Sequence, residues 1–225
     1  LHSLYNQQGI TSIAERRTEF ESIDLFRDLA KAGELTMRVD CTRMLDPVPK
    51  TLDECLKKLD EMTHGRDGNG DYGPTGHGDD WVRIGPLKVL LDGGMLIGTA
   101  YMRQPWGVTS TYQITDPDYR GILNVKPELL EPLYAEAARR GWRLAAHCTG
   151  EASLDVLLDC YEKIQKQSDI RAQRFEVCHA NFQSVENFKR CRQLGIVADM
   201  QPAWLYKDGA SLLQSRQRLG RRPAT

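Results

Sequence analysis

Three residues could together hold a metal ion: Lys88, His147 and His179. Lys88 lies inside the apolar run 84–92, and each histidine closes a short apolar segment. Short apolar segments separated by helical patterns predict buried parallel strands. Because the ends of such strands meet at one face of the sheet, we expect the three side chains to converge there as the ligands of a metal-dependent active site.

Lys88 is the least usual of the three, since a buried ammonium is costly unless it is paired or loses its charge. Burial favours the neutral amine, which can capture carbon dioxide as a carbamate, an anion able to bridge two metal ions. The alternative is an ammonium that reaches solvent or pairs with an acid such as Asp92. Lys88 taken alone favours that alternative, and the two histidines favour the carbamate.

The elements that must position these residues alternate along the chain. Strands are predicted at 10–14, 35–41, 82–91, 143–147, 175–179 and 196–200, and helices at 20–32, 52–62, 128–140, 152–165 and 185–194. Such alternation predicts an α/β fold with a parallel sheet and right-handed crossovers. About six βα units make a partial (β/α)8 barrel, two units short of closure. We expect residues 1–225 to form this single incomplete barrel domain.

Five segments in this order resemble the family 3 amidohydrolases, which include N-substituted formamide deformylases; the segments are 9–13, 87–93, 147–152, 177–180 and 199–204. The resemblance implies a metal-dependent hydrolase with a binuclear divalent metal site, for which zinc is expected. In that family the lysine is the bridging carbamate, here Lys88, and two histidines bind one metal, here His147 and His179.

The chain departs from the family pattern at two places. The family begins with a His-x-His pair on the first barrel strand and ends with an Asp, both metal ligand and general base, on the last. Neither is present here. The resemblance therefore implies an interior fragment of a longer enzyme, without the first and last barrel strands and any β-sandwich domain. The catalytic Asp is expected outside this chain, and the fragment alone is expected to be inactive.

Three further residues are candidates for substrate binding. Glu151 follows His147 at the predicted start of a helix, where a charge that favours the helix dipole is the competing interpretation. Trp204 and Tyr206 follow a strand end and could line a pocket or simply pack. The glycine-rich stretch 92–107 leaves the lysine strand, and loops at this end of a barrel build active sites; a structural excursion is the alternative.

Composition excludes several classes. A net charge of −1 over 225 residues gives no electrostatic case for nucleic acid or an anionic membrane. No run approaches the roughly 20 apolar residues of a membrane span. The six cysteines show neither metal-ribbon nor disulfide spacing, which predicts reduced, buried thiols. Localisation stays open, with the cytoplasm slightly favoured.

The sequence thus predicts a hydrolase of a small-molecule carbon–nitrogen bond, an amide or formamide. A metal-dependent esterase or lactonase is the close alternative, and a catalytically inert barrel fragment with a structural or ligand-binding role is the distant one. Unpaired strands at the sheet edges would also favour homo-oligomers or another partner chain.

Overall fold

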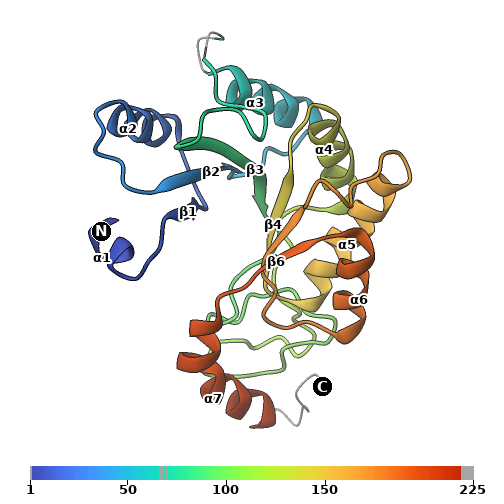
Figure 1. Ribbon diagram of the computed structural model, residues 1–225. Helices are drawn as coiled ribbons and strands as arrows, with labels where there is room; N and C mark the ends of the chain where they lie inside the picture. Colours follow the sequence, from blue (N-terminus) through green and yellow to red (C-terminus); the bar gives the residue numbers. More distant parts are fainter. Residues whose placement is uncertain (1, 66–67, 69, 219–225) are drawn as a thin grey trace. The chain divides into compact units, whose positions relative to one another are not determined.

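The computed structural model describes residues 2–65, 68 and 70–218. Its strands run parallel in the order β1-β2-β3-β4-β5-β6 (Figure 1). They are β1 (Ser12–Glu15), β2 (Arg38–Leu45), β3 (Val82–Leu90), β4 (Leu144–Cys148), β5 (Glu176–His179) and β6 (Val197–Asp199). Each strand follows its predecessor without reversal, as in a (β/α)8 barrel and unlike a doubly wound sheet. The predicted partial barrel is confirmed.

Helices alternate with these strands as predicted. They are α1 (His2–Gln7), α2 (Phe20–Lys31), α3 (Leu52–His64), α4 (Pro127–Arg139), α5 (Glu151–Gln165), α6 (Val185–Leu194) and α7 (Pro202–Arg218). Local signals set several ends: Thr51 and Glu54 form a capping box at α3, and Gly195, with φ of +68°, ends α6. No helix was predicted after residue 194. The polar composition and internal Gly209 of α7 conceal it in the sequence.

One strand extends well beyond its prediction. β2 reaches Leu45, whereas the prediction ended the strand at residue 41. The prediction stopped early because the charged Arg43 interrupts the apolar pattern on which it was based. Arg43 is nevertheless 2% exposed. Its guanidinium lies 4.3 Å from the ring centroid of Phe20 and donates a hydrogen bond of 2.8 Å to the carbonyl of Thr18. Cation–π attraction and this hydrogen bond thus offset part of the cost of burying the charge.

The chain divides into two compact units, the first comprising Leu1–Val89 and Pro132–Leu144 and the second Leu90–Glu131 and Ala145–Thr225. In the first unit, Ile23 of α2, Val39 of β2 and Leu59 of α3 are almost completely buried. In the second, Tyr161 of α5 contacts Phe175 with ring centroids 5.1 Å apart. Each unit therefore has apolar residues of its own in the interior.

The connection between β3 and α4, residues 91–126, contains no regular strand or helix but is not loose. Ala100, Met102, Trp106 and Ile114 form a buried apolar cluster within it. The indole Nε1 of Trp106 donates to the carbonyl of Ala100 at 2.8 Å. This segment is therefore held by its own small core.

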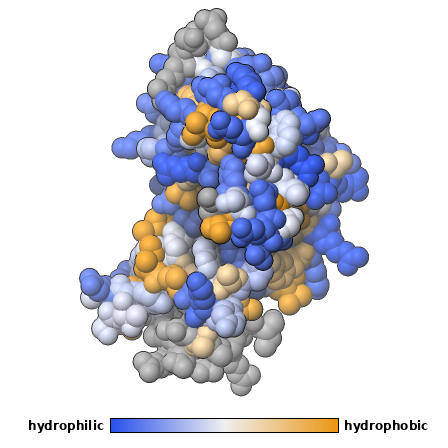
Figure 2. All heavy atoms as spheres, turned by 60° about the vertical axis from the view of Figure 1, so that its left-hand side comes forward, coloured by the Kyte–Doolittle hydropathy of each residue, from blue (hydrophilic) through white to orange (hydrophobic). Residues whose placement is uncertain are grey.

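The surface is mostly hydrophilic on the face shown in Figure 2, with hydrophobic residues in scattered groups. Exposed apolar side chains of the segment 91–126 include Leu96, Ile97, Val108 and Ile122. Among the described residues, no helix combines the length and apolar character needed to cross a membrane.

Candidate metal centre

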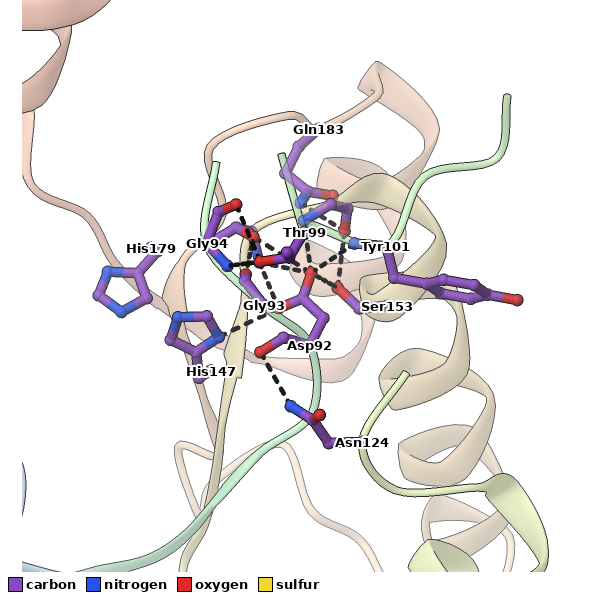
Figure 3. Close-up of polar contacts among 12 residues, drawn as sticks. Asp92, Gly93, Gly94, Thr99, Tyr101, Asn124, His147, Ser153, His179 and Gln183 are labelled. Atoms are coloured by element: carbon purple, nitrogen blue, oxygen red, sulfur yellow. Dashed lines mark hydrogen bonds and ion pairs between the residues drawn. The ribbon is translucent and has the colours of Figure 1, made fainter. Parts of the chain in front are cut away.

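The second unit brings His147 and His179 together. His147 lies near the end of β4 and His179 ends β5, and their ring centroids are 4.6 Å apart (Figure 3). In the register of these strands, His179 lies opposite Cys148 and not His147. Strict alternation would turn the two rings to opposite faces. His179 has φ of +79° and Ala180 has φ of +48°, so the strand geometry is broken at this residue.

Positive φ at a non-glycine residue costs free energy, and strained residues of this kind cluster at functional sites. At His179 the positive φ accompanies a ring that lies beside the ring of His147, which the alternation of an ideal strand would not allow. Sequence alternation alone could not have predicted this local turn of the backbone.

His147 is held by a buried carboxylate. Its Nδ1 lies 3.0 Å from Oδ1 of Asp92, whose side chain is fully buried. Since a carboxylate can only accept, Nδ1 carries the proton and the lone pair is on Nε2. This is the arrangement in which a histidine binds a metal through Nε2 while a carboxylate fixes its tautomer and orientation.

Asp92 is the centre of a wider hydrogen-bond network (Figure 3). Its carboxylate accepts from backbone N–H groups at 2.8 to 3.1 Å and from two hydroxyls at 2.8 and 3.2 Å; the backbone donors are Tyr101, Thr149 and Gly150, and the hydroxyls are those of Thr149 and Ser153. These donors compensate the loss of hydration that burial imposes on the charge. The network also fixes the carboxylate beside the first turn of α5.

His179 is held in a similar way by an amide. Its Nδ1 lies 2.5 Å from Oε1 of Gln201, and Nε2 of Gln201 donates to the carbonyl of Asp199 at 3.1 Å, which fixes the orientation of the amide. The proton of His179 is therefore also on Nδ1. Its ring stacks on Trp204, with centroids 5.0 Å apart and planes 18° apart.

Each of these two imidazoles has its lone pair on Nε2, the atom through which a histidine can bind a metal. Within the part of the chain that the structure describes, no three His, Cys, Asp or Glu side chains lie close enough together to hold a metal ion. Binding of a metal by the two histidines therefore stays a prediction, and it would need at least one further ligand.

Lys88 belongs to the first unit, so its convergence with the histidines stays a prediction. It is 6% exposed and pairs in register with Met44 of β2. Three residues of β3 span the distance that two residues of β2 span, between Cys41 opposite Ile84 and Arg43 opposite Leu87. Because of this β-bulge at residues 85–86, Lys88 lies on the opposite face of β3 from Ile84, whereas in an unbroken strand the two residues would share a face.

The predicted substrate-binding residues are placed differently from one another. Glu151 begins α5, and its Oε2 is buried without a hydrogen-bond partner among the described residues. Trp204 stacks on His179, whereas Tyr206 is 91% exposed on α7. The role of all three in substrate binding stays a prediction.

Sequence reasoning missed Asp92 and Gln201. Asp92 was considered only as a possible partner of Lys88, and its true partner lies 55 positions away. Its place two residues beyond the end of β3 was the available signal, since polar residues at strand ends build sites. The six cysteines are reduced and buried, as predicted. Burial raises the pKa of Cys148 well above its usual range, which leaves that thiol protonated.

Comparison with known proteins agrees with this fold. The family model described as the amidohydrolase family matches residues 3–224. The chain is 29% identical over 133 residues to Protein LONG AFTER FAR-RED 3 of Arabidopsis thaliana, and 26% identical over 128 residues to the putative amidohydrolase YtcJ of Bacillus subtilis (strain 168). The matches cover 59% and 57% of this chain but 22% of each relative.

A solved structure is also similar, that of an uncharacterized metal-dependent hydrolase from Pyrococcus horikoshii OT3. It aligns with a TM-score of 0.65 and 20% identity, over 92% of this chain and 36% of that chain. At this identity the likeness shows the fold. The chain spans well under half the length of each of these proteins.

Proposed function

The chain belongs to the amidohydrolase family, and from that premise we propose that its protein is a metal-dependent hydrolase of a non-peptide carbon–nitrogen bond, in an amide or formamide. The observation that carries the proposal is the histidine pair. The rings of His147 and His179 lie 4.6 Å apart, and each Nδ1 is held by an acceptor that leaves the lone pair on Nε2. Two oriented imidazoles side by side suit a divalent metal, for which we propose zinc.

His147 and His179 would hold one ion of a binuclear site. Lys88, buried on β3, is proposed as the bridging ligand after its neutral amine has added carbon dioxide and released a proton to form a carbamate. When bound, the metal pair would supply Lewis-acid activation of a water molecule and of the scissile carbonyl. The general base is proposed to be an Asp from sequence outside this chain.

Residues beside the histidines would bind the substrate. The buried Oε2 of Glu151 needs a donor, and an amide N–H of the substrate would supply one. The ring of Trp204, stacked on His179, would form an apolar wall and fix the imidazole plane. Tyr206 is proposed to contact the outer part of a larger substrate, because its ring is exposed.

The test uses the complete gene product and the 225-residue chain side by side. Each is assayed with zinc and bicarbonate against formamide, N-acyl, ester and lactone substrates. We expect amide or formamide turnover by the complete protein and none by the chain alone, since a missing base costs roughly 10²- to 10⁴-fold. His147→Ala and His179→Ala should abolish turnover and lower zinc content, whereas His64→Ala, a change at an exposed histidine of α3, should not.

Turnover of esters or lactones alone would favour the alternative hydrolase. A complete protein that binds zinc equally well with and without both histidines would contradict the proposed centre. Equal turnover by the chain and the complete protein would show that the catalytic base lies within these 225 residues.

A further inference from the structure

We propose that Asp92 is a positioning residue that decides which nitrogen of His147 can bind a metal, and that the segment 92–101 and the start of α5 fix it for that task. The inference rests on the proposed metal-dependent function and goes beyond it, because it assigns a role to a residue outside the ligand set. It concerns the proton on the ring of His147, which can be observed without any metal.

The geometry of Asp92 separates two roles. Oδ2 lies 2.8 Å from the backbone N–H of Gly150, 2.8 Å from the hydroxyl of Ser153 and 3.1 Å from the backbone N–H of Tyr101. These contacts join the segment 92–101 to α5 and would explain a purely structural aspartate. Oδ1 instead accepts from the backbone N–H of Thr149 at 3.0 Å and lies 3.0 Å from Nδ1 of His147. The contact with His147 neither joins these elements nor caps the helix.

The carboxylate cannot easily rotate away from His147. Donors on the backbone hold Oδ2, and the side chain is fully buried, so water offers no competing partner. Oδ1 therefore presents a fixed acceptor to the imidazole, and the Nδ1–H tautomer is imposed. Neutral histidine in water prefers the proton on Nε2, which would block the nitrogen proposed to bind the metal.

Replacing Asp92 by asparagine should move the proton of the His147 ring from Nδ1 to Nε2. The shape is conserved, but one oxygen becomes an NH2 group that donates and cannot accept. Three donors, from Tyr101, Gly150 and Ser153, converge on the Oδ2 position. The backbone N–H of Thr149, 3.0 Å from Oδ1, also reaches Oδ2 at 3.2 Å, so the remaining oxygen should take the Oδ2 position and accept from all four. The NH2 group would then face Nδ1 of His147 and require a lone pair there. The proton would move to Nε2, and metal binding at that nitrogen would be lost.

The test is nitrogen NMR of the metal-free 225-residue chain labelled in its five histidines, at about pH 8, well above the usual histidine pKa near 6.5. His147→Gln assigns the resonance. We expect the proton on Nδ1 in the parent and on Nε2 in Asp92→Asn. Zinc affinity of the complete gene product, measured against a competing chelator, should fall about 10- to 100-fold in Asp92→Asn.

Two control variants separate positioning from folding. Asp155→Asn makes the same chemical change on α5 but removes a partner of Arg103, and Ser153→Ala removes one donor to Asp92 while keeping the carboxylate. Both should leave the His147 tautomer unchanged. Circular dichroism of each variant checks the fold.

Three outcomes would overturn the inference: a proton on Nε2 in the parent, an unchanged tautomer in Asp92→Asn, or the same shift in Asp155→Asn. The failure of the proposed function has a different signature. In that case the tautomer would change as expected in Asp92→Asn, while the complete gene product bound zinc neither with nor without the substitution.

Discussion

Gly150→Ala should be among the most damaging small substitutions in the chain. A Cβ at residue 150 would lie 2.0 Å from the carbonyl oxygen of Tyr101 and 2.5 Å from its carbonyl carbon. Both are backbone atoms, so no side chain can rotate to make room. An ordinary contact near 3.4 Å requires the segment to move by about 1.4 Å.

The magnitude follows from the contacts that this movement breaks. The carbonyl of Tyr101 accepts from the N–H groups of Ala152 and Ser153 at 3.2 and 3.4 Å. Losing both costs about 1 kcal/mol each, and overpacking adds roughly 1–3 kcal/mol. We therefore expect Gly150→Ala to lower the free energy of unfolding by about 3–5 kcal/mol, a large part of the 5–15 kcal/mol typical of a domain.

The assay is urea unfolding followed by circular dichroism, with Gly94→Ala as the matched control. A Cβ at residue 94 would meet the flexible side chain of Ile97 at 3.3 Å, so this control should cost less than about 1 kcal/mol. The slope of the transition should stay the same, because both variants expose the same surface on unfolding. A Gly150→Ala protein as stable as the Gly94→Ala protein would refute the close-approach reasoning.

Three further predictions concern pH, thiols and aromatic packing. Hydrogen bonds from Arg139 and its neighbour hold the pKa of Glu136 at about 2, below its usual 4.5, so its stabilisation is present above pH 4.5 and is lost as the pH falls toward 2. Acid titration of stability should therefore be flatter in Glu136→Gln across that window. All six cysteines are buried, and burial raises the pKa of Cys148 well above its usual range, so a thiol reagent should label none of the six until the protein unfolds. In urea unfolding, Trp204→Ala should cost about 1 kcal/mol for its lost stacking and Tyr206→Ala less than about 0.5 kcal/mol.

Each of these has a clear contrary result. If stability depended on acid pH in the same way in the parent and in Glu136→Gln, the ionised Glu136 would contribute nothing to stability. Labelling of thiols under conditions where circular dichroism shows the native fold would contradict their burial. Equal costs for the two aromatic substitutions would mean that the stack on His179 contributes nothing to stability.

Much of the fold could be predicted because local patterns agree with the tertiary structure. The helix predicted at 128–140 is observed as α4, one residue earlier at each end, and α6 has its predicted bounds. The second half of β2 was not predicted because Arg43 is a buried charge in a strand. The cost of burying this charge is offset by contacts with Phe20 and Thr18, which only the folded chain brings close. Patterns of apolar residues carry no information on such a partner.

The candidate site was predictable in its residue types but not in its geometry. Strand-end positions indicated both histidines, and the structure brings them together. The turn of His179 depends on a positive φ, which no strand pattern predicts at a histidine. The contact of Asp92 with His147 joins residues 55 positions apart, so only the folded chain shows it.

Side chains alternate between the two faces of a strand, and the extra residue of the bulge at 85–86 shifts this alternation by one in the second half of β3. Deleting one of these two residues would turn Lys88 to the other face of the sheet, although the lysine itself would be retained. An alignment that scores substitutions would still record a lysine at the matching column. In a related sequence, a gap opposite Gly85 and Pro86 would therefore indicate that the proposed role of Lys88 is lost, even where the lysine itself is present.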